Sequence, residues 1–268
     1  MGFRVQQACA VALPRSGSIE DRVSDLDRET QCILKSFNTW AFKREQPTEP
    51  EMLAQVVATA VLHNLPVSFV LYWGKGPRAR IARPDIACLD YLKAMGDRIA
   101  AVYEPGAQFH LCLTDTHARL NGHAEAVIDS YFGDISAAAR VRNMAAVRLS
   151  LLVDRAGPGT SSDKPFPEEM LDSLVRCAAR WYRGGDDPRQ GALTYLGMNR
   201  VESQAVAAHY HESIFLTFNG SGYRNLFPES LPVFYMNSLR RGTAVKPWFM
   251  NEDCQPYVNA GAAGGSDL

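Results

Sequence analysis

The stretch Val67–Tyr91, VSFVLYWGKGPRARIARPDIACLDY, decides the fold of this chain. It opens with the apolar run Val67–Trp73, which predicts a buried strand, because a short continuous apolar run bounded by turn residues is typical of strands covered on both faces. The glycines and proline of Gly74–Arg80 end regular structure. Pro84 and Asp85 then predict a helix start, with proline in the first turn and an acid at the positive end of the helix dipole. A strand, a glycine loop and a helix in this order favour an open α/β sheet, which binds ligands at the carboxyl ends of its strands.

Positive side chains gather in the loop directly after this strand. They are Lys75, Arg78, Arg80 and Arg83. Because ammonium and guanidinium groups bind phosphate and carboxylate, the loop predicts an anion site, with a phosphorylated metabolite as the first expected ligand. The plainer alternative is a solvated basic loop that only joins two elements.

The composition is that of an ordinary globular protein. The chain has 268 residues, of which 46% are hydrophobic and 21% charged, enough for a substantial core in one domain or two tight subdomains. Its formal net charge of −1 gives no global field that would attract nucleic acid or a membrane surface. We therefore expect small molecules as partners, with no nucleic acid and no membrane, and a homodimer remains an open alternative.

The cysteine pattern and the N-terminal segment favour a cytoplasmic protein. The six cysteines form no C-x-x-C pair, and most stand in apolar helix or strand patterns, so we interpret them as reduced core residues rather than zinc ligands. The apolar run near the N-terminus is too short for a membrane span and makes a poor signal peptide. The cysteines are Cys9, Cys32, Cys88, Cys112, Cys177 and Cys254.

Hydrophobic periodicity predicts helices alternating with strands. Helices are expected over 19–44, 48–63 (starting with a capping box at Thr48–Glu51), 85–102, 123–132, 134–144, 165–182 and 189–209. Strands are expected over 67–73, 107–114, 147–153, 213–218 and 231–236, with a loop or edge strand over 242–249. Helix–strand alternation with short turns is typical of parallel βαβ units. The expected fold is α/β, a Rossmann-like, mostly parallel sheet flanked by helices.

The sequence also predicts the domain organisation. Residues 1–18 are expected to be a flexible N-terminus, 19–258 a single α/β domain, and 259–268 a flexible tail of glycine and alanine. Residues 154–164, DRAGPGTSSDK, have no apolar anchor and are interpreted as a subdomain joint or a lid.

A second polar cluster follows the second expected strand. The connection over residues 115–122 carries Asp115, His117 and Arg119, and His123 follows it. The Asp-x-His spacing is similar to that of metal ligands, but no distant third ligand is evident, so no metal is expected. A carboxylate that orients or deprotonates an amine beside cations is the favoured interpretation. A surface loop with a capping aspartate is the alternative.

The C-terminal third offers weaker signals. His209 and His211 alternate at a strand start and either bind a metal or lie near the negative end of a helix. The loop over residues 219–224 is not a G-x-G-x-x-G motif, so dinucleotide binding is weakly supported, although Arg224 adds a cation. Further cations nearby in sequence are Arg240, Arg241 and Lys246. No Walker loop, G-x-S-x-G elbow or H-E-x-x-H motif occurs, which argues against the corresponding hydrolases.

The order of these motifs resembles the isonitrile (isocyanide) synthases of the pyoverdine/dityrosine-biosynthesis family. The resemblance covers about residues 53–132 and is looser in the C-terminal third, where it ends at Lys246-Pro247-Trp248. In the family the loop is closer to Lys-Ser-Pro-Asn, and this chain keeps Lys75 and Pro77 of that motif. After the next strand the family has Ser-Asp-Gly, and this chain keeps only the aspartate, Asp115. The matching segments are Leu65–Leu71, Gly74–Pro77, Pro84-Asp85, Leu89–Leu92 and Val102–Ala107, continuing through the strand to Asp115.

The resemblance implies a Rossmann-like enzyme that joins the amine of an amino acid, typically tyrosine or tryptophan, to the ketone of ribulose 5-phosphate. The sugar carbon becomes the isonitrile carbon, and no metal or redox cofactor is implied. The implied catalytic residues are Lys75, Asp115 and His117, with Lys75 assisting carbonyl chemistry if its pKa is lowered and Asp115 acting as base or amine anchor. The resemblance also implies that Lys75, Arg78 and Arg80 hold the phosphate and that His117 and Arg119 contact substrate. The sequence itself adds Arg224 and Lys246 as further expected substrate-binding cations.

Two other functions remain open at this point. One is a different Rossmann-like small-molecule enzyme, for example one that uses S-adenosylmethionine, with Asp115 as the acid that ends the second strand. The cationic first turn, in place of G-x-G, argues against it. The other is a non-catalytic ligand-binding protein with the same fold.

Overall fold

A five-stranded parallel sheet forms the centre of the molecule in the computed structural model, which describes residues 19–157 and 166–238. Its strand order is β3-β2-β1-β4-β5, and every neighbouring pair is parallel. This arrangement confirms the α/β fold, and the order is that of five strands of a Rossmann sheet. The strands are β1 Val67–Trp73, β2 Ala107–Leu113, β3 Ala145–Arg148, β4 Ser213–Thr217 and β5 Val233–Tyr235.

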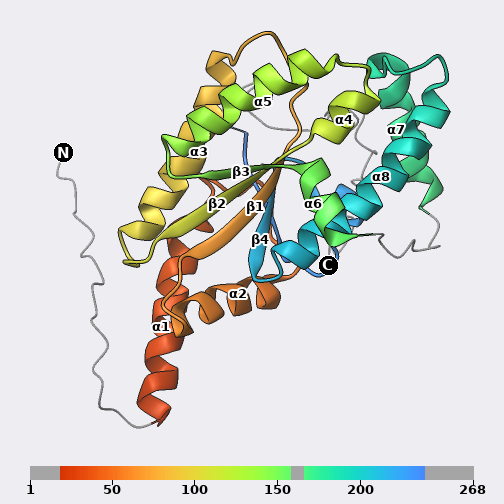
Figure 1. Ribbon diagram of the computed structural model, residues 1–268. Helices are drawn as coiled ribbons and strands as arrows, with labels where there is room; N and C mark the ends of the chain where they lie inside the picture. Colours follow the sequence, from red (N-terminus) through yellow and green to blue (C-terminus); the bar gives the residue numbers. More distant parts are fainter. Residues whose placement is uncertain (1–18, 158–165, 239–268) are drawn as a thin grey trace, which may run out of the picture.

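Helices cover both faces of the sheet (Figure 1). One face packs against α1 Ile19–Phe37, α2 Pro50–Leu62, α3 Arg83–Ala100 and α5 Glu125–Arg140. The other face packs against α6 Leu149–Ala156, α7 Glu168–Trp181 and α8 Pro188–His209. Two short elements, α4 Asp115–Leu120 and the 3-10 helix η1 Ser221–Leu226, follow β2 and β4.

The alternation of side chains along β1 explains its continuous apolar sequence. Phe69, Leu71 and Trp73 enter the core under α1, α2, α3 and α5, while Val70 and Tyr72 enter the core under α6, α7 and α8. Since both faces are covered, every position of this strand except the partly buried Ser68 is buried, and all of these buried positions are apolar or aromatic.

The order of the strands fixes where a ligand is expected. β1 lies between β2 and β4, and the chain winds from β1 toward β3 on one side and toward β5 on the other. The pairing of Leu71 with Leu216 places the carboxyl ends of β1 and β4 at the same edge of the sheet. This is the topological switch point, where open α/β sheets bind ligands.

Several predicted elements were wrong in extent. The first helix ends at Phe37 rather than at residue 44. The strand expected over 147–153 is wrong: β3 ends at Arg148, and the residues that follow form α6. The prediction failed because a short apolar run is compatible with a strand or a buried helix, and periodicity does not distinguish the two. The connection over 115–122, expected to be irregular, contains α4.

The helices expected over 123–132 and 134–144 are one helix, α5. Its glycine, Gly133, faces open space, because a Cβ built there would meet nothing within 4 Å. The helix therefore continues through this residue, and Asp134 does not begin a new one.

The capping box predicted at Thr48 does not form. Glu49 is the N-cap of α2 and makes no side-chain cap bond. The Thr48 hydroxyl donates to the Glu49 carboxylate at 2.7 Å, and Arg224 Nε donates to the same carboxylate at 2.6 Å. The N-cap is therefore Glu49 rather than Thr48, and the Glu49 carboxylate forms a tertiary ion pair with Arg224.

None of the described helices has both the length and the apolar character needed to cross a bilayer. The expected flexible ends, 1–18 and 259–268, lie outside the described residues, as does the segment over 242–249 with Lys246. Most of the joint expected at 154–164 also lies outside them, while its first residues belong to α6. The division into one domain and two flexible ends stays a prediction.

Replacement of Phe69 tests the packing of the central strand. The Phe69 ring is fully buried, stacks on Phe109 with ring centroids 5.1 Å apart, and meets the edge of Phe37 at 5.4 Å. Phe69→Ala is expected to lower the free energy of unfolding by about 3–5 kcal/mol, through lost burial and a new cavity. Urea unfolding measures this, with Val141→Ala, 82% exposed, as the matched control expected to change it by less than about 0.5 kcal/mol. Equal effects of the two substitutions would contradict the proposed core.

Candidate active site

A buried ion pair stands where β1 ends. Lys75 follows the strand and is 8% exposed, and its Nζ lies 3.1 Å from Oδ1 of Asp85. Asp85, in the first turn of α3, is fully buried. Nη2 of Arg78, whose side chain is exposed, lies 3.6 Å from the same oxygen. The structure thus brings Lys75 and Arg78 together around an acid to which the sequence assigned only a place at a helix start.

Asp85 also joins three elements at this edge of the sheet. Its Oδ2 accepts a hydrogen bond from Ala82 N at 2.8 Å, which caps the start of α3. Its Oδ1 accepts one from the Tyr131 hydroxyl of α5 at 3.2 Å, and that hydroxyl accepts from Trp73 Nε1 of β1 at 3.3 Å. Burial raises the pKa of Tyr131 above its ordinary value, so the phenol stays a donor at neutral pH.

The remaining cations of the loop face solvent. Arg80 and Arg83 are exposed, and no ion pair within residues 19–157 and 166–238 engages either of them. They are therefore the loop cations best placed to meet an incoming anion.

His123 approaches the same loop from the start of α5. A Cβ built on Gly76 would lie 3.8 Å from His123 Nε2, an ordinary van der Waals contact, so the imidazole lies directly beside the loop. Burial lowers the pKa of His123, which favours the neutral ring at neutral pH. The sequence placed His123 near the second polar cluster, whereas the fold places it beside the cationic loop.

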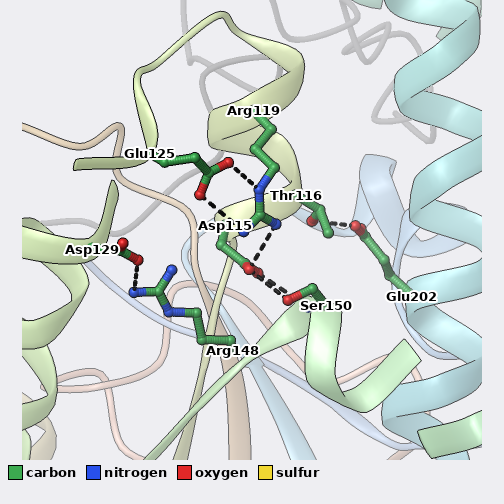
Figure 2. Close-up of polar contacts among 8 residues, drawn as sticks. All are labelled: Asp115, Thr116, Arg119, Glu125, Asp129, Arg148, Ser150 and Glu202. Atoms are coloured by element: carbon green, nitrogen blue, oxygen red, sulfur yellow. Dashed lines mark hydrogen bonds and ion pairs between the residues drawn. The ribbon is translucent and has the colours of Figure 1, made fainter. Parts of the chain in front are cut away.

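Asp115, at the end of β2, holds together a second network (Figure 2). It is fully buried, and its Oδ1 accepts from Ser150 N at 3.1 Å. Its Oδ2 accepts from Ser150 Oγ at 2.6 Å and from Arg119 Nη1 at 2.9 Å. Because Ser150 lies in the first turn of α6, Asp115 caps that helix from a different element.

Arg119 completes this network at the surface. Its Nε donates to Glu125 at 2.6 Å, and this hydrogen bond is the largest cause that raises the pKa of Arg119. With Glu125 and Asp115 as partners, the guanidinium is held between α4 and α5. In this geometry Asp115 and Arg119 bind each other and their supports.

His117 points from α4 toward α8. It is 3% exposed, and its Nε2 lies 2.6 Å from Oε2 of Glu202, a buried acid of α8. The Thr116 hydroxyl donates to the other oxygen of Glu202 at 2.5 Å. The imidazole edge meets the rings of Tyr72 and Tyr195. Sequence reasoning missed Glu202, because no local motif marks an acid inside a long helix.

Of the two remaining predicted binding residues, Arg224 belongs to the described part of the chain. Arg224, in η1, donates to Glu49 and to the backbone carbonyls of residues 227, 228, 229 and 231. These contacts make it the support of the loop that leads to β5. Lys246 lies outside the described residues.

His209 and His211 lie at the opposite, amino-terminal edge of the sheet. They line a cavity of about 200 Å³ beside Tyr210, whose ring lies tilted against that of His110 with ring centroids 4.8 Å apart. Burial, and then the proximity of His209, lower the pKa of His110. Among the described residues no group of three or more His, Cys, Asp or Glu side chains is arranged to hold a metal ion.

Comparisons with known proteins identify the fold. No protein-family model matches the chain, and no curated protein matches its sequence. The crystal structure of the PvcA protein from Pseudomonas aeruginosa is similar, with a TM-score of 0.57 and 15% sequence identity over 83% of this chain and 87% of the PvcA chain. At this identity the similarity shows a shared fold.

The Lys75–Asp85 pair gives a test of stability. Asp85→Asn is expected to destabilise the protein by about 3–5 kcal/mol, because it leaves the Lys75 ammonium buried without its anion. The control is Asp97→Asn, since Asp97 pairs with Lys93 at 2.7 Å on the exposed side of α3; its cost is expected to be below about 1 kcal/mol. Urea unfolding of both variants, and of the double variant Lys75→Met/Asp85→Leu, measures this. The double variant should recover part of the loss; equal costs for the two single variants would argue against a buried pair.

The buried thiols give a second test. Burial raises the pKa of Cys88 to about 12, with Lys75 acting in the opposite direction, and burial also raises the pKa of Cys112. Both thiols are therefore expected to resist iodoacetamide at pH 8 in the native protein and to react fully in urea. Peptide mass spectrometry after timed alkylation measures both rates. Fast modification of native Cys88 would show that the end of β1 is open to solvent.

Proposed function

We propose that this chain is a biosynthetic enzyme of the isonitrile synthase type, which condenses the amine of an amino acid with ribulose 5-phosphate. PvcA, whose fold it shares, is an isonitrile synthase. The observation that carries the proposal is the Lys75–Asp85 pair, with Arg78 beside it, at the carboxyl end of β1 next to the switch point of the sheet. This edge supplies positive charge for a phosphate and a fixed amine for carbonyl chemistry.

The exposed arginines are assigned to the phosphate. Arg80 and Arg83 have no ion pair within the described chain. Arg78 is bound only by a long contact of 3.6 Å with Asp85, an acid that Lys75 also binds. A sugar phosphate would gain charge-assisted hydrogen bonds from them without breaking a buried pair. Phosphate binding at this loop positions the ketone of the sugar over the end of β1.

Lys75 and His123 are assigned to proton handling. The Asp85 carboxylate orients the Lys75 ammonium, which would donate a hydrogen bond to the ketone oxygen as the amine attacks. The imidazole of His123, kept neutral by burial, lies beside the loop and would accept a proton from the attacking amine. For Asp115, Arg119 and His117 we propose positioning roles, since each is held by Ser150, Glu125 or Glu202.

The direct test is an assay of the purified protein with single amino acids and ribulose 5-phosphate. The expected product is an isonitrile, detected by mass spectrometry and by reaction with a tetrazine probe. Lys75→Met is expected to lower the rate at least about 100-fold, the typical contribution of a positioned acid–base group, while Lys93→Met on the exposed side of α3 leaves it unchanged. If Lys75→Met does not fold, Arg80→Ala replaces it, with an expected rise of about tenfold in KM for ribulose 5-phosphate and little change in kcat.

Thermal-shift measurements separate the alternatives. Ribulose 5-phosphate is expected to raise the melting temperature in a way that Arg80→Ala weakens. A shift with S-adenosylmethionine alone would instead favour a methyl-transferring enzyme. Phosphate binding without product from any amino acid would indicate a non-catalytic binding protein.

A further inference from the structure

Helix α2 turns an uncharged face to solvent at the lower edge of the molecule in Figure 1. Its buried residues lie on the side that packs against α1, β1 and β4. The larger residues left outside recur every three or four positions and so share the opposite side of the helix. No residue between Glu51 and His63 is charged, whereas the solvent side of a surface helix is ordinarily charged or polar. The larger outer residues are Met52, Gln55, Val56, Thr59 and Leu62.

Large apolar side chains stand out from this face. Leu62 is 67% exposed, Leu65 in the turn after the helix is 50% exposed, and Met52 at the other end is 37% exposed. Single exposed leucines are normal on a protein surface, but several on one stretch without charges form a patch of the kind that binds a partner.

The apolar surface continues into a hollow beside the end of the helix. Val56, Thr59 and Leu65 line one side of the cavity of about 200 Å³ described above, and residues 209–213 line the other. The cavity is smaller than a usual small-molecule site of about 300–1,000 Å³. Its far side is polar, with two histidines and Glu212. An apolar centre with a polar rim is the pattern of a protein–protein interface.

The two ends of the face carry complementary groups that have no partner. Glu51 stands in the first turn of α2, and His63 is its C-cap. Both are exposed, and within residues 19–157 and 166–238 neither side chain makes a hydrogen bond or an ion pair. They are twelve positions apart, about 18 Å along the helix, so they cannot pair with each other in one chain.

We propose that two copies of this chain associate through α2, with the two helices antiparallel about a two-fold axis. A two-fold axis near Val56 and Thr59 brings the start of one helix beside the end of the other. Glu51 of each copy then meets His63 of the other, and the helix dipoles are opposed. The charge-free surface between them, with Met52 and Leu62, is removed from water. The second copy is the occupant that supplies both missing partners at once.

The size of the face sets the expected strength of the dimer. A helix of 13 residues is about 20 Å long, and its outer side with the adjoining turn is smaller than the roughly 800 Å² per partner of a standard interface. We therefore expect a reversible dimer with a dissociation constant in the micromolar range. The dimer is independent of the proposed reaction, since no residue assigned to that reaction lies on α2.

Sedimentation velocity of the full chain over a wide range of concentration tests the dimer. The unchanged protein is expected to pass from one chain to two as its concentration rises. Leu62→Glu places a charge in the centre of the contact and is expected to keep the protein monomeric throughout. The matched control is Val141→Glu at the end of α5, where Val141 is 82% exposed, and it should dimerise as the unchanged protein does. A monomer at every concentration, or equal behaviour of the two variants, would overturn the proposal.

A charge exchange tests the antiparallel arrangement. His63→Glu sets two acids against each other at both ends of the contact and is expected to weaken the dimer about threefold or more. Adding Glu51→Lys to this variant restores opposite charges and is expected to recover the loss. Because positions 51 and 63 of one chain are too far apart to interact, recovery reports a contact between copies. Failure of the double variant to recover, with melting temperatures showing that both variants fold, would reject the arrangement. These measurements use no substrate, so their failure is distinct from failure of the isonitrile assay.

Discussion

The carboxyl edge of the sheet depends on the buried carboxylate of Asp85. It receives Lys75 from the end of β1, the Ala82 amide from the start of α3, and the Tyr131 hydroxyl from α5. An ion removed from water is costly unless its partners satisfy it, and these contacts offset that cost. The same contacts fix the loop after the central strand, so the position of its cations follows from one acid.

The neighbouring strand ends in the same way. Asp115, after β2, is also fully buried and receives Ser150 from α6 and Arg119 from α4. Each buried acid joins the end of its strand to the first turn of a helix, where backbone N–H groups need acceptors. A consequence for function is that Lys75 and Asp115, two charged residues that the sequence places at strand ends, are buried and paired inside the protein. The cations left for a ligand are those at the rim of the loop, Arg80 and Arg83.

Helix α8 supports the region after β2 and also lines a groove of about 790 Å³ together with η1 and the residues that precede α7. Its inner face binds α4 through Glu202, which holds Thr116 and His117 and so supports the region after β2. Its outer part lines the groove that contains Asn199 and Arg200.

The sequence by itself determined the class of fold and the position of the cationic loop. The apolar run Val67–Trp73, the glycines after it and the helix start at Pro84 are local signals, and the strand was predicted with its observed bounds. The cations of the loop were likewise visible as neighbours in the chain. The partners of the polar side chains at the strand ends could not be predicted from the sequence. The pairs Lys75–Asp85, Asp115–Ser150 and His117–Glu202 each join residues on different elements.

Only the tertiary structure decided which charged side chains remain available to bind a ligand. The Glu49 carboxylate binds Arg224 rather than the start of α2, residues 149–156 form a helix, and His123 lies beside Gly76. Each outcome follows from long-range contacts that compete with, and outweigh, local preferences worth about 1 kcal/mol or less. Hydrophobic patterning was therefore enough to predict the sheet and most of its helices. The candidate site could not be predicted in the same way, because which charged side chains are buried and paired depends on the whole fold.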